Sequence, residues 1–337
     1  MKKFFPILCS LAAYSVFALN LETEIMTNSR QLTFEGVRSG EGYFSSSGNK
    51  IVYQSENSSD NPFYQIYLLD LLTGENDIVT SGTGKTTCAW IHPDEKTILF
   101  SSTHLDPLAQ EKQNEEIKLR ESGKARKYSW DYDQHYDLFK KDTVTGKSTR
   151  LTFEDGYDAE GSFSPNGNKV VFASNRNAYS KALSKKEQDI FNRDKSFFND
   201  IYIMDHDGSN VQQLTDTPGY DGGPFFNAQG NQICWRRFTP SGHKAEIYTM
   251  DLSTRVERKV TSLDAMSWAP FFHPSNDFLV FSTNIHGFNN FELYAVDALG
   301  NKEPIRITDS EGFDGLPSFS PSGKYISWTS NKTNDKK

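Results

Sequence analysis

The chain has 337 residues and a formal net charge of −8, from 36 Lys and Arg against 44 Asp and Glu. Its length allows one large all-β domain or two smaller domains. A net negative chain lacks the basic surface that nucleic-acid phosphates require, so we expect no nucleic acid among its partners.

Residues 1–18 have the pattern of a secretory signal peptide. Lys2 and Lys3 precede an apolar stretch that ends in Val16-Phe17-Ala18, a small-residue cleavage site. The stretch is shorter than the roughly 20 residues that a membrane span requires. We therefore expect cleavage after Ala18, a periplasmic location and no integral membrane span, with a retained N-terminal anchor as the alternative. Loss of the two lysines changes the formal charge from −8 to −10.

Residues 19–337 carry six copies of one repeat. The first landmark of each copy is a Thr preceded by an aliphatic residue. These Thr residues are Thr33, Thr80, Thr152, Thr215, Thr261 and Thr308. Thirteen residues later comes a turn at Ser46, Pro93, Pro165, Ala228, Pro274 and Pro321. Both landmarks give spacings of 47, 72, 63, 46 and 47 residues. A period of roughly 40–50 residues with several short strands indicates a β-propeller. The sequence therefore predicts a single all-β domain, a six-bladed β-propeller.

The third copy shows how one blade is built. Four strands are expected at Gly161–Ser164, Lys169–Ser174, Ile201–Met204 and Val211–Thr215. The second and third are almost continuously apolar, which is typical of sheets covered on both faces.

The two ends of the repeat array differ from its middle. The sixth copy has no obvious third strand, and residues 23–33 precede the first complete repeat. We predict that an N-terminal strand closes the last blade; a three-stranded blade and a truncated C terminus are the alternatives.

Two insertions, 103–134 and 177–199, follow the second strands of repeats two and three. Both have stretches of charged, helical composition, so we predict short helices in blades 2 and 3. Because the connections after second strands and those before first strands share one face of a propeller, the insertions should lie near the channel mouth.

Polar residues enter each first strand at the same register. Seven residues before the turn stand Ser39, Thr86, Asp158, Asp221, Ser267 and Asp314, and Glu160 lies two residues beyond Asp158. A ring of this kind around the axis would form an acidic mouth for a divalent cation such as Ca²⁺, or for the basic end of a partner. Asx turns within each loop are the alternative.

Residues that break the repeat are further candidates for binding. Trp268 replaces the small residue of the other repeats. Arg236 and Arg237 stand where other repeats have Ser or Thr, and these two arginines would neutralise carboxylates or bind an anion. In extended form, the segment from Trp130 to Asp137 places four side chains on one side, which are Asp131, Asp133, His135 and Asp137. Metal ligation there and a hydrogen-bonded loop both remain open. Cys88 and Cys234 fall in different repeats and are predicted to be free thiols.

The repeat resembles the WD40-like Tol repeat of TolB-type propellers. The segment Asn-Asp-Ile-Tyr-Ile-Met-Asp at 199–205, followed by Gln213-Leu214-Thr215, is similar to that repeat, and the resemblance covers residues 30–330. It does not extend to the α/β domain that precedes the propeller in TolB. The resemblance implies a six-bladed propeller of the Gram-negative envelope that binds a protein or peptide at its channel mouth. We also expect the protein to be a monomer.

No nucleophile–base pair is recognisable in the sequence, so no catalytic residue is assigned. Two other functions stay open. A metal-dependent polysaccharide lyase or glycosidase would use Asp158, Glu160 and Asp221 as acid and base. A carbohydrate-binding module would use Trp130, Tyr220 and Trp268 as stacking surfaces.

Overall fold

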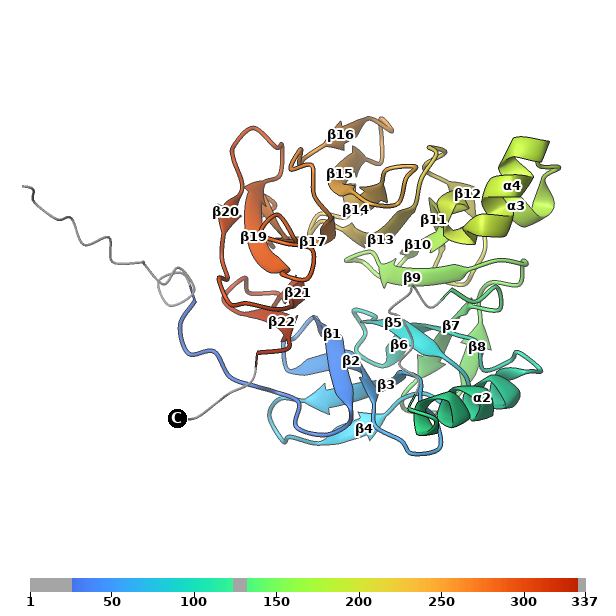
Figure 1. Cartoon of the computed structure of the whole chain (residues 1–337). Helices are drawn as coiled ribbons and strands as arrows, with labels where there is room; N and C mark the ends of the chain where they lie inside the picture. Colours follow the sequence, from blue (N-terminus) through green and yellow to red (C-terminus); the bar gives the residue numbers. More distant parts are fainter. Residues whose placement is uncertain (1–25, 124–131, 333–337) are drawn as a thin grey trace, which may run out of the picture.

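The computed structural model describes residues 26–123 and 132–332, which form sheets arranged around a central axis (Figure 1). Blade 1 consists of β1 (Arg38–Phe44), β2 (Lys50–Glu56), β3 (Gln65–Asp70) and β4 (Asn76–Ile78). Blade 2 consists of β5 (Thr86–Ile91), β6 (Thr97–Ser102), β7 (Asp137–Asp142) and β8 (Ser148–Arg150). Blade 3 consists of β9 (Asp158–Phe163), β10 (Lys169–Ser174), β11 (Asp200–Asp205) and β12 (Gln212–Gln213). Blade 4 consists of β13 (Asp221–Phe226), β14 (Gln232–Phe238), β15 (Ala245–Asp251) and β16 (Glu257–Lys259). Blade 5 consists of β17 (Ser267–Phe272), β18 (Phe278–Thr283), β19 (Glu292–Asp297) and β20 (Ile305–Arg306).

The β-propeller fold is confirmed, but the prediction of six blades is wrong. The described residues form five four-stranded blades, and the sixth repeat forms only a two-stranded sheet, β21 (Asp314–Phe319) and β22 (Ile326–Ser330). The N-terminal strand predicted near residues 23–33 to complete the last blade is not found in its described part, since residues 26–33 form no strand, and its residues before 26 lie outside the described residues. Residues 27–31 read Thr-Asn-Ser-Arg-Gln, and so offer no apolar side chain to cover a sheet.

The ring closes where β1 meets the two-stranded sheet. The backbone N–H of Glu41 donates to Thr329 Oγ1 at 2.9 Å, and Ser318 Oγ donates to the carbonyl of Gly42 at 2.7 Å. A side chain on Gly40 would collide with Thr329, because a Cβ there would lie 2.6 Å from Oγ1. Close packing between β1 and its neighbours β21 and β22 therefore closes the ring.

The helices lie in two connections on one side of the ring (Figure 1). Helix α2 (Ala109–Glu121) lies between β6 and β7, whereas α3 (Arg176–Ser180), α4 (Lys185–Arg193) and the 3₁₀ helix η1 (Lys195–Phe198) lie between β10 and β11. Helix α4 begins at a capping box, in which Ser184 and Glu187 satisfy each other's backbone N–H groups. None of the helices in 26–123 and 132–332 is long and apolar enough to cross a membrane.

The Thr of the repeat links two strands in every blade. In blade 2, Thr152 Oγ1 accepts from the backbone N–H of Leu138 at 2.9 Å and donates to Asp137 at 3.1 Å. The corresponding Thr accepts the same backbone hydrogen bond in the other four blades. The recurrence of this Thr is explained by a buried hydrogen bond that would otherwise be lost.

Candidate functional site

Four aromatic rings from four blades fill the axis. Tyr43 lies 4.9 Å from Trp90 and 5.3 Å from Phe225 between ring centroids, and Phe225 lies 5.5 Å from Phe271. These residues occupy the same register in β1, β5, β13 and β17, three residues before each turn. We call them the aromatic plug. Because rings from non-adjacent blades touch, the plug closes the channel at this level.

Two residues before the position of the aromatic plug, each first strand has a bulge at which the backbone is left-handed. All six equivalent positions have positive φ, between 51° and 62°, and they are Glu41, Cys88, Glu160, Gly223, Ala269 and Leu316. The register between first and second strands shifts at this place in all six sheets. Five of the six are not glycine, and left-handed backbone costs such residues about 1 kcal/mol each. The side chains of Glu41 and Glu160 thereby come together above the plug.

Glu160 is the centre of a buried hydrogen-bond cluster. Arg236 Nη2 lies 2.9 Å from Glu160 Oε1 and 2.8 Å from the Tyr220 hydroxyl, which itself donates to Glu160. The Glu160 and Arg236 side chains are each 4 % exposed. The backbone N–H of Gly223 also donates to this carboxylate. A glutamate in this position is therefore held rigidly and neutralised by its partners.

Glu41 lies beside that cluster and is only half-buried. Burial, reinforced by the charge of Glu160, raises the pKa of Glu41 to about 7, although a hydrogen bond from Cys88 opposes the shift. Burial also raises the pKa of the Cys88 thiol well above its usual value. As predicted, Cys88 and Cys234 are both free thiols. The axis above the plug thus holds one carboxyl group that titrates near neutral pH.

The predicted ring carboxylates are buried, and each has a side-chain partner from its own repeat. Asp158 pairs with Arg176 at 2.7 Å, and Asp221 makes two 2.7 Å bonds to Arg237. Asp314 accepts from Trp328 Nε1 at 3.0 Å. Asp158 and Asp221 have no exposed surface, and Asp314 is 2 % exposed. The contacts of Asp221 and Asp314 hold a first strand to its second strand, whereas Asp158 is held by Arg176 of α3. A direct role of these carboxylates in binding stays a prediction.

The other predicted binding residues lie in different environments. Trp268 is half-buried and packs edge-on against Phe291 and Phe313 at 5.8 and 6.0 Å between centroids. Arg237 also pairs with Glu257 at 2.7 Å, so both predicted arginines neutralise carboxylates. Trp130 and Asp131 lie outside the described residues.

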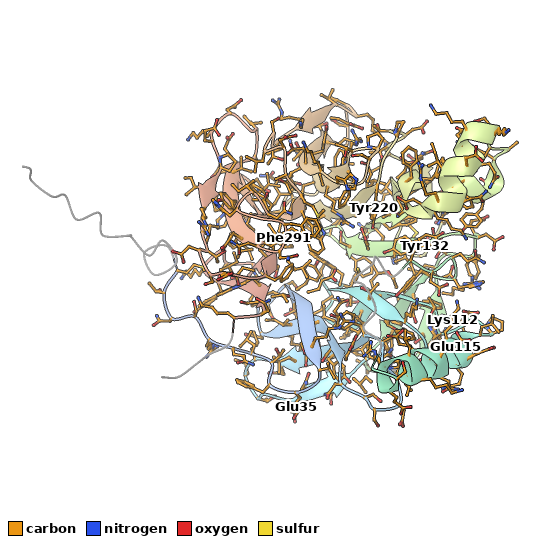
Figure 2. The ribbon with its side chains drawn as sticks, viewed as in Figure 1. Glu35, Lys112, Glu115, Tyr132, Tyr220 and Phe291 are labelled. Carbon is orange, nitrogen blue, oxygen red and sulfur yellow. The ribbon has the colours of Figure 1, made fainter. Side chains whose placement is uncertain are left out.

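A pocket of 540 Å³ lies between the two insertions. Its lining includes Lys112 and Glu115 of α2 and, after that helix, Tyr132 (Figure 2). Lys195, from the second insertion, also lines it. The Lys195 ammonium lies over three rings, at 5.7 Å from Tyr132 and at similar distances from Tyr179 and Phe191. We call this the insertion pocket. Its aromatic floor and mixed charges suit an amphipathic ligand such as a peptide.

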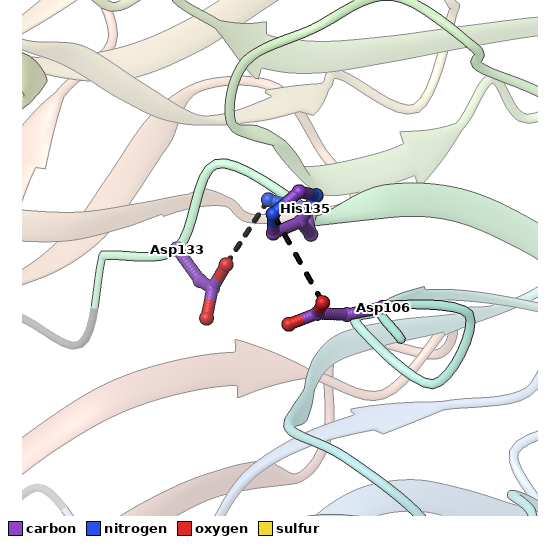
Figure 3. A group of neighbouring side chains, drawn as sticks. All are labelled: Asp106, Asp133 and His135. Carbon is purple, nitrogen blue, oxygen red and sulfur yellow. Dashed lines mark hydrogen bonds and ion pairs between the residues drawn. The ribbon is translucent and has the colours of Figure 1, made fainter. Parts of the chain in front are cut away.

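Two carboxylates and a histidine gather at one edge of this pocket. Ligand atoms of Asp106, Asp133 and His135 all lie within 4.8 Å of one another (Figure 3). Lys112 Nζ lies 2.7 Å from both Asp106 Oδ2 and Asp133 Oδ2. The lysine ammonium thus takes the place that a cation would have between these carboxylates. Of the predicted metal ligands, Asp133 and His135 come together, whereas Asp137 pairs with Arg150 at 2.6 Å.

Sequence reasoning missed Asp106, Lys112 and Lys195 as members of one site. All three lie in the two insertions, where the repeat gives no register and the charged residues have the ordinary composition of a solvent-exposed helix. Their only signal was that both insertions follow second strands of adjacent blades.

Comparisons with known proteins agree with the repeat. Residues 188–336 match the family model described as the TolB beta propeller domain. The Protein TolB homolog of Chlorobium chlorochromatii (strain CaD3) is 31 % identical over 147 residues, covering 42 % of this chain and 31 % of that protein. The chain thus spans less than a third of that relative.

Two solved structures share the fold. The crystal structure of TolB from Acinetobacter baumannii superposes with a TM-score of 0.58 at 21 % identity, over 82 % of this chain and 56 % of the other. A structure from Agrobacterium tumefaciens described as a TolB gives 0.59 at 17 % identity, over 87 % of this chain and 90 % of the other.

Proposed function

We propose that the chain belongs to the TolB-like family of β-propellers, which its similarity to the TolB beta propeller domain over residues 188–336 supports, and that it is a non-catalytic scaffold that binds a protein or peptide in the bacterial cell envelope. The observation that carries this proposal is the insertion pocket, which adjoins the predicted channel mouth and combines aromatic surface with lysine and glutamate side chains. Below the mouth, the aromatic plug leaves no path along the axis for a polymer to pass through.

The pairing of the acidic residues supports a scaffold over a lyase or glycosidase. A general acid or base must reach its substrate. Asp158 and Asp221 have no exposed surface and are each held by an arginine, and Glu160 is held by Arg236. These three carboxylates are therefore poor candidates for acid–base chemistry in this arrangement.

The location follows from the predicted signal peptide, residues 1–18. Export and cleavage after Ala18 are tested by N-terminal sequencing of the protein from a periplasmic fraction. A protein that keeps residues 1–18 in the cytosol would overturn the periplasmic part of the proposal.

Site-specific photo-crosslinking in cells tests the binding face. We would place a photoreactive amino acid at Glu115, which is exposed at the pocket, and at Leu72, which is 76 % exposed in the turn after a third strand. A protein adduct formed at Glu115 and weakened by Lys195→Glu would support the proposal. Equal adducts at both positions, or none at Glu115, would contradict it. Cleavage of glycans by the purified chain would favour the alternative function, a polysaccharide lyase or glycosidase.

A further inference from the structure

A second pocket, of 290 Å³, lies between blades 2 and 3 on the face opposite the insertions. One wall consists of the first turn of blade 2 and the β7–β8 hairpin, and the other of Phe163 at the end of β9 and His206 in the turn after β11. We call this the turn-face pocket. It shares no lining residue with the insertion pocket, because turns after first and third strands lie at the opposite end of a blade from connections after second strands.

The turn-face pocket lies where one repeat departs from the others. Two residues before the Asp that ends each third strand stand Leu68, Lys140, Ile203, Thr249 and Ala295, in blades 1 to 5. Leu68, Ile203 and Ala295 pack against apolar clusters, and Thr249 is buried. Blade 2 is the one blade of the five with a charged side chain at this position, and its boundary with blade 3 holds the pocket.

A second lysine enters the pocket from the turn after β7. The equivalent positions, five residues before the Thr of the repeat, are Glu75, Lys147, Asn210, Val256 and Glu303. Lys140 lies directly opposite Thr149 in the β7–β8 pairing, and Lys147 lies two residues before Thr149. The three side chains therefore project from the same face of the hairpin, toward blade 3.

Both lysines are available to an acceptor from outside the chain. Lys140 Nζ donates to the carbonyl of His206 at 3.1 Å, and no ion pair of the described residues includes Lys140 or Lys147. The two carboxylates of the pocket are already satisfied. Asp94 accepts two backbone hydrogen bonds within its own turn, at 2.8 and 2.9 Å, and Asp142 does the same, at 2.9 and 2.8 Å.

The two histidines of the pocket differ in their freedom. His92 Nδ1 accepts from the backbone N–H of Asp94 at 3.1 Å, and its Nε2 lies 3.2 Å from the carbonyl of Gly167 in blade 3. Gly167 has a φ of 74°, and a Cβ there would lie 2.1 Å from His92 Nε2, so glycine is required for this contact. The exposed His206 ring makes no hydrogen bond within the described part of the chain and is a further donor to a ligand.

The shape of the pocket favours a small oxyanion over a sugar ring. Its volume of 290 Å³ is at the lower end of ligand pockets. Phe163 is 2 % exposed, and the His92 and His206 rings are tilted by 44° with centroids 6.4 Å apart, so these rings offer no flat stacking surface. Two ammonium groups without carboxylate partners, beside a threonine hydroxyl, suit the oxygens of a phosphate, for which lysine is a common ligand.

We propose that the turn-face pocket binds the phosphate group of a phosphomonoester. Lys140 and Lys147 neutralise the charge of the phosphate, which is about −1.5 to −2 at pH 7. Thr149 and His206 donate hydrogen bonds to its oxygens. A soluble phosphomonoester and a lipid headgroup such as that of phosphatidic acid both offer this group. Because the pocket is separate from the insertion pocket, loss of binding at one leaves the other intact.

Isothermal titration calorimetry of the whole chain with glycerol 3-phosphate tests the proposal. We expect saturable binding with a Kd of about 0.1–1 mM, since Asp94 and Asp142 oppose the anion, and no binding of glycerol. Lys140→Leu, which gives β7 the residue that blade 1 has at this position, should weaken binding about tenfold, because one charge-assisted hydrogen bond is lost.

Lys141→Leu is the matched control. Lys141 carries the same charge, but it lies on the opposite face of β7, where it donates to the carbonyl of Val79 in blade 1. This variant should bind glycerol 3-phosphate like wild type. Equal weakening by Lys140→Leu and Lys141→Leu would indicate an adventitious ion only and would overturn the proposal.

A measurement on the unaltered protein covers the case in which Lys140→Leu does not fold. Glycerol 3-phosphate should protect Lys140 and Lys147 from acetylation, as detected by mass spectrometry, but not the exposed Lys118 of α2. Equal acetylation of all three lysines with and without the probe, or no calorimetric binding at about 10 mM probe, would overturn the proposal.

Vesicles distinguish the two sources of the phosphate. Retention of the chain on vesicles of phosphatidylcholine with phosphatidic acid, but not of phosphatidylcholine alone, would identify a lipid if Lys140→Leu abolishes it. Binding of glycerol 3-phosphate without retention on either vesicle would identify a soluble phosphomonoester. Retention that Lys140→Leu leaves unchanged would contradict a role of the turn-face pocket at the lipid surface.

Discussion

Arg236 of β14 and Glu160 of β9 form an ion pair across the boundary between blades 4 and 3, with 2.9 Å between Nη2 and Oε1. Both side chains are 4 % exposed, so each charge depends on the other for neutralisation. The pair also explains why one repeat has an arginine where the others have a small or polar residue.

Arg236→Met should destabilise the fold by about 3–5 kcal/mol, since it leaves the Glu160 carboxylate buried without a cation. Urea unfolding followed by tryptophan fluorescence measures the loss. In the double variant with Glu160→Gln, much of the stability should return. If the two single changes simply add, the pair is not coupled in the way the structure indicates.

The free energy needed to ionise the buried carboxyl of Asp200 should fall when Gln213→Arg places a cation beside it. Equivalent acids have cationic partners: Asp137 has Arg150, and Glu292 has Arg306 at 2.7 Å. Asp200 has no cation in any ion pair of the described residues; its side-chain donors are the neutral Gln213 at 2.9 Å and Thr215 at 3.4 Å. Burial, together with the charge of Asp221, raises the pKa of Asp200 to about 8, against about 6 for Asp137.

A folded-state pKa above the unfolded value means that the folded protein retains a proton that the unfolded chain releases. The associated stability is therefore present at acidic pH and is lost as pH rises from about 4 to 8. Gln213→Arg should reduce this loss and add about 1–2 kcal/mol at pH 8. Thermal melts at pH 5 and pH 8 measure it. The converse control is Lys259→Gln, which removes the cation 3.8 Å from Glu246. Equal pH profiles for wild type and Gln213→Arg would contradict the argument about Asp200.

Lys112→Ala should convert the Asp106–Asp133–His135 cluster into a site for divalent cations. Without the ammonium, two carboxylate oxygens and an imidazole face one another, a ligand set that suits Zn²⁺ or Mn²⁺. The melting temperature of this variant should rise with either metal and fall again with EDTA. Lys118→Ala on the exposed face of the same helix is the control. A wild-type chain that responds to metal as strongly as Lys112→Ala would show that the lysine does not take the cation's place.

The sequence predicted the repeat well because its signals are local. The aliphatic-Thr pair marks a hydrogen bond within one blade, and the turn follows from short-range backbone chemistry. Blade number failed because it depends on whether a segment distant in sequence adds to β22, and the polar residues 27–31 do not do so.

Side-chain register was predicted better than side-chain partners. The positions of Asp158 and Asp221 entering each first strand were correctly aligned, but their burial depends on Arg176 and Arg237, which lie 18 and 16 residues away. The insertion pocket could not be predicted at all, since it needs two insertions to pack against each other. Local sequence pattern therefore predicts the strands and turns of each blade, but it does not predict contacts between insertions.

The half-buried carboxyl of Glu41 should dominate the pH dependence of the axis. Its pKa, raised to about 7 by burial, exceeds the value of 4.5 expected in the unfolded chain. Its contribution is thus fully present below about pH 4.5 and is lost as pH rises through 7. Glu41→Gln removes this titration, so the variant should lose about 1–3 kcal/mol less than wild type between pH 5 and pH 8. Urea unfolding at the two pH values gives the difference directly. Glu35 is exposed at the edge of the molecule (Figure 2), so the control Glu35→Gln should leave the pH dependence of stability as it is in wild type. A Glu41→Gln profile parallel to that of wild type would mean that Glu41 ionises as freely in the fold as in water, and that the axis above the plug is open to solvent.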